Sequence, residues 1–209
     1  MSSLPESYYV AKVDAKTGKE FVKKHHYSHG IHNGPMTYGM FDRGSELVGV
    51  LAFATPSSEA VCSSVFGPEF KRSVTELHRL VLLDEVPHNA ESFFISRALK
   101  LLRQDRPNYV AVLSFADTTQ GHVGTIYQAT NALYCGTTGR ATFYEDESGR
   151  LRHPRQNGVN ITAEEAKIRG WVAVKREAKH RYLFLLPMSK TERRVWISRL
   201  KLVPQEYPK

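Results

Sequence analysis

The first part of the chain changes its hydrophobic period as it proceeds. Residues 8–14 alternate apolar and polar side chains, as a half-buried strand does. Residues 16–27 have the apolar spacing of a helix and lead into a loop rich in His, Gly and Asn. Residues 36–56 then predict two strands around a turn at residues 42–46. We therefore expect a strand, a helix and a hairpin, in that order.

Two apolar segments flank the clearest helix of the sequence. The stretches "ELHRLVLLD", residues 76–84, and "YVAVLSFAD", residues 109–117, are predicted to be buried strands. Residues 89–106 between them carry apolar side chains at helical spacing, with Asn89 as a candidate N-cap and Pro107 beyond the end. A loop is expected before the first of these strands. The centre of the chain is thus strand, helix, strand.

The remaining segments predict a mixed α/β protein. Residues 121–136 are expected to form a helix that Gly136 closes. Further strands follow, with helices over residues 161–170 and 190–201. This order predicts a mixed sheet with helices on both faces and not a doubly wound repeat. The length agrees with one domain over residues 1–209.

The order of these elements resembles the acyltransferase superfamily called GNAT. The resemblance implies that the strands of residues 76–84 and 109–117 splay apart to receive an acyl-coenzyme A. The sequence departs from the superfamily in one place, because "VPHNAES", residues 86–92, stands where a Q/R-x-x-G-x-G/A loop would hold the pyrophosphate. The resemblance therefore predicts a GNAT-like fold and leaves open whether acetyl-CoA or a related acyl donor is the cofactor.

Three residues are the candidate cofactor-binding set. Asn89 and Ser92 stand at the start of the central helix, where unpaired backbone N–H groups favour an anion; the alternative is a plain N-cap. Arg79 is flanked by leucines and a valine in its strand and needs a partner there. We favour a phosphate of a cofactor or of DNA as that partner, and an internal carboxylate is the alternative.

Composition predicts a soluble protein of the cytoplasm. The chain is 41% hydrophobic and 24% charged, and it has no apolar run near the roughly 20 residues that span a bilayer. The N-terminal sequence lacks the features of a secretory signal. The two cysteines, Cys62 and Cys135, are far apart and have small or apolar neighbours, which favours inert buried thiols over a disulfide or a zinc site.

The charge is concentrated in the C-terminal part. Residues 151–209 hold 14 Lys and Arg against 5 Asp and Glu, whereas the net charge of the whole chain is +8. Cations alternate there with tryptophan, tyrosine and phenylalanine, a mixture that favours a nucleic acid. We expect this basic portion to bind DNA phosphates; the alternative is that its cations lie on ordinary solvated surfaces. The residues expected to bind phosphate are Lys175, Arg176, Lys179 and Arg181.

Three blocks together resemble the Mom family, phage proteins that modify adenine in the phage's own DNA to evade restriction. The blocks are "HHYSHG", "HRLVLLDEVPHNAESFFISRALKLL" and "SFADTTQGHVGTIYQATNALYCG". The resemblance covers roughly residues 21–136 and implies a GNAT-like fold and a methylcarbamoyl group on the adenine N6 amine. It also implies an iron requirement and double-stranded DNA with a flipped adenine as the partner, in the cytoplasm of the infected host.

The chemistry of an adenine amine needs a base, because its lone pair is delocalised into the ring. Asp117 ends a buried strand, where an open α/β sheet presents ligands, and is the first choice for an acid/base or metal-binding group. Capping of the following turn is the alternative. His26, Tyr27 and Tyr127 match the family blocks and complete the candidate catalytic set. His26, Asp117 and Tyr127 together would offer nitrogen and oxygen ligands suited to Fe(II).

The nearby histidines and the helix expected over residues 121–136 extend this site. His25, His29 and His32 lie near His26 in sequence; the cluster with His32 is compatible with a metal site, and the alternative is that these histidines are solvated in the loop and that His25 and His29 are incidental. The substrate-binding candidates on or beside the predicted helix are Ser114, His122 and Asn131, with Tyr127, Asn131 and Tyr134 on one helical face. For Ser114, simple packing is favoured.

Two further functions fit the same sequence. The chain could be a GNAT-type acetyltransferase of a small amine or a protein, which would bind acetyl-CoA tightly without DNA. It could also be a DNA-binding module without catalysis, which would yield no modified nucleoside. The sequence leaves the donor, the DNA context and the choice between monomer and dimer open.

Overall fold

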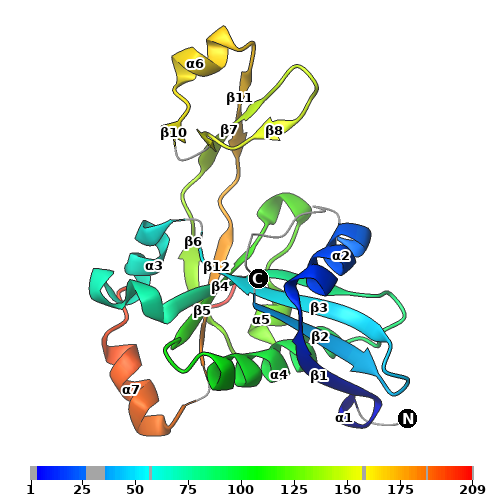
Figure 1. Cartoon of the computed structure of the whole chain (residues 1–209). Coiled ribbons are helices and arrows are strands. Elements are labelled where there is room, and N and C mark those ends of the chain that lie inside the picture. The colour runs from blue at the N-terminus through cyan, green and yellow to red at the C-terminus, as the bar shows by residue number, and fades with distance from the viewer. Residues whose placement is uncertain (1–3, 27–35, 57, 157–158, 187, 209) are drawn as a thin grey trace.

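The computed structural model describes residues 4–26, 36–56, 58–156, 159–186 and 188–208. A seven-stranded sheet in the order β1-β2-β3-β4-β5-β12-β6 forms the main body (Figure 1). Its strands are β1 (Tyr8–Val13), β2 (Met36–Asp42), β3 (Leu47–Ala54), β4 (Val74–Leu82), β5 (Ala111–Ala116), β6 (Leu133–Thr137) and β12 (His180–Leu185). Its helices are α1 (Leu4–Ser7), α2 (Ala15–His25), α3 (Glu59–Phe66), η1 (Pro68–Ser73), α4 (Ala90–Asp105), η2 (Thr118–Gln120), α5 (Thr125–Gln128) and α7 (Lys190–Ser198).

Helices cover both faces of this sheet, as the sequence predicts. On one face α4 and α5 pack into the largest core, which includes Phe53 of β3 and Phe94 of α4. On the other face α2 packs through Val22 on β3 and β4. On that same face α3 and α7 cover a second core that contains Leu113 and Leu183. The strand order and the two layers of helices confirm the GNAT-like mixed α/β fold.

The two central parallel strands separate, as the resemblance to GNAT implies. β4 and β5 pair only over the three positions Val74↔Ala111, Thr75↔Val112 and Glu76↔Leu113. Both strands continue beyond these positions without pairing to each other. We call the segments of β4 beyond Glu76 and of β5 beyond Leu113 the splay. The splay lies in the middle of the sheet, between the face covered by α4 and α5 and the face covered by α2 and α3.

A small sheet projects from the main body between β6 and β12, which are neighbours in the main sheet (Figure 1). We call residues 138–179 the arm. Its elements are β7 (Ala141–Glu145), β8 (Leu151–Arg152), β9 (Arg155–Gln156), β10 (Val159–Asn160), α6 (Ala163–Ile168) and β11 (Val172–Arg176). The arm has its own core of Tyr144, Ile161, Ala166 and Trp171. The prediction of one domain for the whole chain stays a prediction.

Most predicted elements are found where the hydrophobic period is strong. The helix expected over residues 121–136 is wrong, because α5 ends at Gln128 and the chain continues into β6. Asn131 has φ +57°, a left-handed conformation that ends a helix. Leu133 and Tyr134 instead pair with β12, so cross-strand packing overrides the local helical pattern.

The loop expected before β4 is also wrong, since α3 and η1 occupy it. Ser58 caps α3 by accepting a hydrogen bond from the Val61 N–H at 3.3 Å. Gly67 ends the helix with φ +113°. Ser58 and Gly67 were the sequence signals that could have predicted α3, but the apolar residues of this short helix recur too weakly at helical spacing. None of the helices in the described ranges is both long and apolar enough to cross a bilayer.

Candidate functional site

A carboxylate and an imidazole meet on β4 at the point where the splay begins. The Nδ1 atom of His78 lies 3.7 Å from Oε1 of Glu76, within ion-pair range but beyond a hydrogen bond. Their side chains are 9% and 16% exposed. Glu76 lies on the α3 side of the sheet, because Val74, two residues earlier on β4, packs in the core that α3 covers. Glu76 and His78 therefore face the side of the sheet that α2 and α3 cover.

A β-bulge places His78 in this position. Across β3 and β4, Phe53 pairs with Leu77 and Ala52 pairs with Arg79, so His78 is the extra residue. Bulges bend a strand and redirect a side chain, and they are common beside active sites. The guanidinium of Arg79 donates a hydrogen bond to the His78 carbonyl at 2.7 Å. The bulge thus brings Glu76 and His78 together beside the splay, while binding of an anion by Arg79 stays a prediction.

Asp117 follows β5 directly and joins the main body to the arm. One carboxylate oxygen accepts hydrogen bonds from the Thr119 N–H at 3.1 Å and the Thr119 hydroxyl at 2.6 Å, so Asp117 caps the turn as the alternative predicted. The other oxygen lies 3.1 Å from Arg176 and 3.4 Å from Lys179. Burial opposes ionisation, but Thr119, Lys179 and Arg176 outweigh it and hold the pKa of Asp117 below its usual range.

Replacing this carboxylate should weaken the junction in a pH-dependent way. Because its pKa is lowered by folding, Asp117 stabilises the fold above its ordinary value of 3.8, and this contribution disappears as the pH falls through the folded pKa. We expect Asp117→Asn to lower the free energy of unfolding by about 1 kcal/mol at pH 7. Urea titrations at pH 7 and pH 3 measure this, and an equal loss at both pH values would contradict it.

The α4 side of the splay is aromatic. Ser114 on β5 is fully buried, and its hydroxyl has no hydrogen-bond partner among the described residues. On the neighbouring strand its register partner is Tyr182, whose ring lies 5.3 Å from that of Tyr127. Tyr134 also packs on Tyr182, and its hydroxyl lies 3.0 Å from Nδ1 of His180. Tyr127 and Ser114 are therefore brought together in one aromatic cluster beside β5.

The start of α4 uses only part of its first-turn amides, since the Ala90 N–H donates to the Pro87 carbonyl at 3.2 Å and the Phe93 N–H to the Asn89 carbonyl at 3.3 Å. Asn89 has φ +72° and makes no side-chain cap, so the plain N-cap is wrong. The Ser92 hydroxyl donates to the Asn89 carbonyl at 2.8 Å. Both residues line a hollow of about 360 Å³, together with Arg97 and Lys100. Since Arg97 and Lys100 carry positive charge beside a helix N-terminus, this hollow suits an anion.

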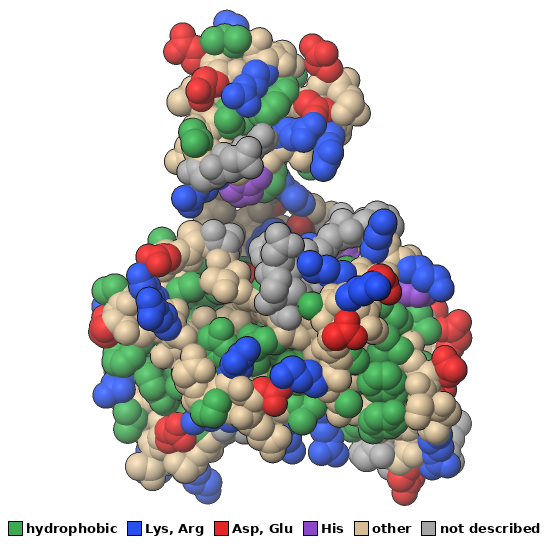
Figure 2. All heavy atoms as spheres, in the orientation of Figure 1, with side chains coloured by type: hydrophobic (Ala, Val, Ile, Leu, Met, Phe, Trp, Pro, Cys, Tyr) green, Lys and Arg blue, Asp and Glu red, His purple; other side chains and the backbone are tan. Residues whose placement is uncertain are grey.

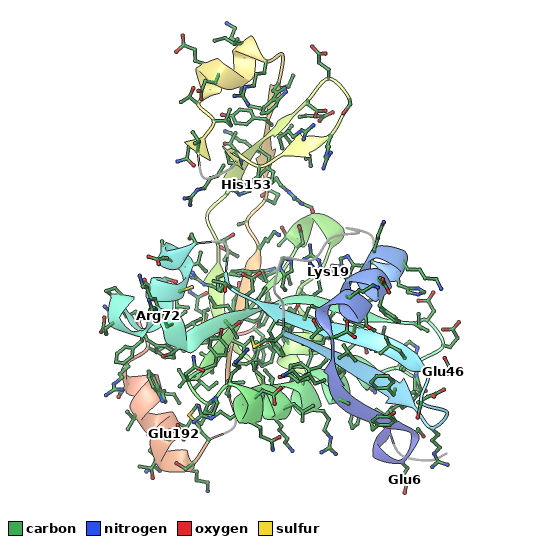
Figure 3. All side chains as sticks on the ribbon, in the orientation of Figure 1. Glu6, Lys19, Glu46, Arg72, His153 and Glu192 are labelled. Carbon is green, nitrogen blue, oxygen red and sulfur yellow. The ribbon has the colours of Figure 1, made fainter. Side chains whose placement is uncertain are left out.

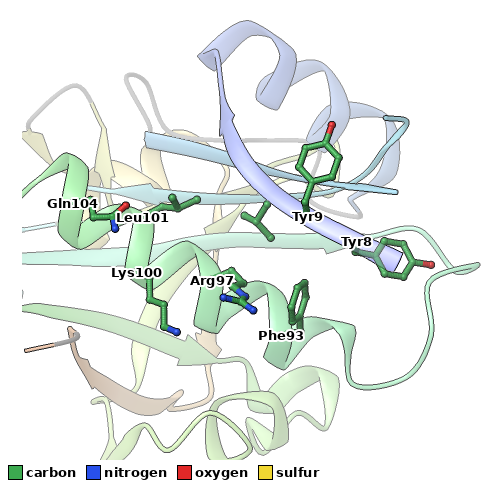
Figure 4. A pocket seen from close by; sticks show the side chains of 8 residues that line it. Tyr8, Tyr9, Phe93, Arg97, Lys100, Leu101 and Gln104 are labelled. Carbon is green, nitrogen blue, oxygen red and sulfur yellow. The ribbon is translucent and has the colours of Figure 1, made fainter. Parts of the chain in front are cut away.

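A second hollow of about 380 Å³ adjoins the first along α4. Figure 4 shows that Arg97 and Lys100 project from α4 beside Phe93, with Tyr8 and Tyr9 on β1 opposite. Phe93, Arg97 and Lys100 line both hollows. The predicted cofactor residues Asn89 and Ser92 thus belong to one polar surface along α4. Arg79 lies on β4 and lines neither hollow.

The four predicted phosphate-binding cations differ in their surroundings. Arg176 and Lys179 pair with Asp117. The guanidinium of Arg181 donates to the Cys135 carbonyl at 2.9 Å. Lys175 is exposed on β11. Three of the four are therefore engaged at the base of the arm, and phosphate binding by this set stays a prediction.

The remaining candidates spread over several segments. His26 ends α2 as its C-cap. His122 is exposed in the loop before α5, and Asn131 is exposed in the turn after it, so the shared helical face with Tyr127 is wrong. Tyr134 lies in β6 and not on that helix. Tyr27, His29 and His32 lie outside the described residues.

Sequence reasoning missed Glu76 and His78. The available signal was the polar pair in "ELHRLVLLD", at i and i+2 on an otherwise apolar strand. Both cysteines are free and buried, as predicted. Burial raises the pKa of the Cys135 thiol to about 11, which agrees with an inert residue.

Comparisons with known proteins agree with this geometry. The model of the Mom protein family matches residues 7–209. The chain is similar to the methylcarbamoylase Mom of Escherichia phage Mu, with 30% identity, 96% of this chain and 83% of that protein covered. A spermidine/spermine N-acetyltransferase from Vibrio cholerae has a similar fold, with a TM-score of 0.50, 11% identity, 92% of this chain and 99% of that chain covered. An Acinetobacter baylyi protein assigned to the acetyltransferases gives a TM-score of 0.50 and 9% identity, with 87% and 94% covered.

Proposed function

Because the chain belongs to the Mom protein family, we propose that it is a phage DNA-modification transferase that adds a methylcarbamoyl group to the N6 amine of adenine. The observation that carries the proposal is the Glu76–His78 pair beside the separated strands β4 and β5. An acyl transfer to an amine needs a base at such an opening. The phage Mu relative is named for this chemistry.

His78 is the proposed base. A carboxylate at Nδ1 favours the tautomer with Nδ1–H, which leaves the basic lone pair on Nε2. The donor must already carry the complete methylcarbamoyl group, including its nitrogen. As the bond between N6 and the transferred carbon forms, His78 takes the proton from N6, and the carrier leaves that carbon with the electron pair of the broken bond. Glu76 orients the ring and stabilises the imidazolium that results. His26, Tyr27 and Tyr127 remain proposed members of the same site.

The cofactor is proposed to be an acyl-coenzyme A or a related acyl donor, which when bound would supply an activated carbonyl carbon. The first-turn amides of α4, with Asn89 and Ser92, fit a pyrophosphate. Arg97 and Lys100 fit further phosphate charge along the same helix. These groups bind and orient a phosphorylated carrier without the glycine-rich loop that GNAT proteins usually have.

The proposed iron site does not fit the residues named for it. Both Asp117 oxygens are already engaged, by Thr119 on one side and by Arg176 and Lys179 on the other. The Tyr127 ring is buried against Tyr182 and Phe184. Within the described ranges no group of three or more His, Cys, Asp or Glu side chains is arranged to hold a metal. We therefore assign no step of the reaction to iron.

The proposed substrate is an adenine that has left the double helix. A base inside a duplex cannot reach a residue such as Glu76 or His78 that is mostly buried, so the enzyme must act on a flipped nucleotide. Restriction enzymes read the unmodified base edge, so a group on N6 in the major groove would block them. The role in the infected cell is protection of phage DNA.

Expression in a bacterial host tests the function directly. Host DNA is digested to nucleosides and analysed by mass spectrometry, with cells carrying the empty vector as the control. We expect a heavier deoxyadenosine only when the protein is made. Unmodified DNA together with acetylated small amines or proteins would favour the acetyltransferase alternative. Unmodified DNA with tight DNA binding alone would favour the module without catalysis.

A further inference from the structure

The small sheet of the arm has two different faces. On one face α6 packs over Tyr144, and the ring of Trp171 lies 6.4 Å from that of Tyr144. Ala166 and Ile161 complete this buried side. Because this sheet has only three strands, β11-β7-β8, it needs a covering element such as α6 to bury a face.

The opposite face is apolar and uncovered. The register pairs Val174 with Phe143 and Val172 with Glu145, and Glu145 in turn pairs with Leu151, so these side chains share that face. Val172 is 67% exposed and Leu151 is 45% exposed. None of these residues belongs to a buried cluster of the described chain. We call the surface of Phe143, Leu151, Val172 and Val174 the arm face.

Arg176 and His153 both contact the Phe143 ring. The Arg176 guanidinium lies 5.3 Å from the centre of the Phe143 ring, and the His153 ring lies 5.1 Å from it at 80°. Figure 3 shows His153 at the end of the arm nearer to the main body. In Figure 2, Lys, Arg and His side chains line that end, whereas acidic and basic side chains are mixed at the outer end of the arm. Glu145 is the carboxylate on the arm face itself.

The arm face is continuous with the candidate site through Arg176. The same guanidinium that stacks on Phe143 donates a hydrogen bond to Asp117 at 3.1 Å. Asp117 in turn follows β5, one strand of the splay. The arm face is thereby linked through Arg176 to Asp117 at the end of β5.

We propose that the arm face binds an unstacked base of the DNA strand next to the flipped adenine. Phe143 stacks on that base, and Arg176 and His153 contact the adjoining phosphates. This rests on the proposed function, since flipping one adenine leaves its neighbours partly unstacked. An aromatic ring beside a guanidinium on an exposed sheet is a combination that single-stranded nucleic acids favour, because every base has a face to stack. A neutral apolar peptide would not require the guanidinium.

The test measures binding of a short fluorescein-labelled duplex that has one adenine opposite an abasic site. Phe143→Ala should weaken this binding about tenfold, the loss expected for one stacked base. Phe143→Leu keeps the apolar packing and should show a similar loss. The slope of affinity against salt should stay unchanged, because no phosphate contact is removed. Tyr9→Ala is the matched control, because Tyr9 is an exposed aromatic residue stacked on Phe41 in the main body.

The outcomes separate this proposal from the proposed function. If the native chain modifies DNA and both Phe143 variants bind the duplex as it does, the arm-face proposal is wrong and the function stands. If the native chain modifies no DNA, the function is wrong, and the Phe143 variants still report whether the arm face binds bases. An equal loss for Tyr9→Ala would also overturn the arm-face proposal, as would a native chain that does not bind the duplex. The native chain could instead self-associate through the arm face. If Phe143→Ala abolished that self-association but left the affinity for the duplex unchanged, the occupant of the arm face would be a second copy of the chain and not DNA.

Discussion

His78→Asn is expected to lower the amount of modified deoxyadenosine per unit of protein by about 100-fold or more. Removal of a general base commonly costs between about 100-fold and 10,000-fold in rate. His78 is the extra residue of the bulge on β4, and its ring faces Glu76 at 3.7 Å. The measurement is mass spectrometry of digested DNA from cells expressing each variant. Affinity for the duplex probe should remain that of the native chain, because His78 is not part of the arm.

Glu76→Gln should produce a smaller loss, about tenfold, since the amide retains the shape but not the charge that stabilises an imidazolium. Glu46→Gln is the matched control, because Glu46 is exposed in the turn before β3. Thermal unfolding of all three variants checks that the loss is not one of folding. Full modification by His78→Asn in a stable protein would remove His78 from the mechanism.

The fold could be predicted from the sequence wherever the local hydrophobic pattern of a segment determines its secondary structure. Residues 76–84, 89–106 and 109–117 have strong periods, and they form β4, α4 and β5. β6 forms by pairing with β12, a strand some 45 residues later in the chain. The local pattern of residues 133–137 alone predicts a helix instead. Propensity within one segment cannot anticipate such a distant partner.

The site could be predicted only in part, for the same reason. Asp117 was found because a polar residue ends an apolar strand, but its partners Arg176 and Lys179 lie about 60 residues away. The contact between Glu76 and His78 depends on a bulge, and a register shift leaves no mark in the hydrophobic pattern. Individual residues could thus be proposed, whereas their pairing required the tertiary structure.

Asp117 connects β5 of the main body with the arm. Through Arg176 and Lys179 it fixes the base of the arm beside β5, and the Thr118 hydroxyl adds a hydrogen bond to the Ala178 carbonyl at 2.8 Å. A DNA phosphate that reached Arg176 would compete with this carboxylate. Asp117 thus positions the base of the arm relative to β5, and its role as an acid/base group stays a prediction.

Excision of the arm is expected to abolish DNA modification while the main body still folds. The Thr138 N–H donates to the Lys179 carbonyl at 2.9 Å, so these two residues already have the spacing of a hairpin end. An Asn-Gly turn that replaces residues 139–178 would close β6 and β12 as a two-residue hairpin. The three cores of the main body contain no residue of the arm, so we expect a melting temperature close to that of the native chain.

The excised protein should bind the duplex probe at least 100-fold more weakly, because the arm face and the cations of β11 are removed together. Its affinity for coenzyme A should be unchanged, since Asn89, Ser92, Arg97 and Lys100 all lie on the loop before α4 and on α4 itself. Fluorescence anisotropy measures the first quantity and calorimetry the second. Native levels of modified deoxyadenosine from the excised chain would show that the main body recognises DNA alone. Loss of coenzyme binding as well would show that the arm supports the main body, in contrast to its separate core.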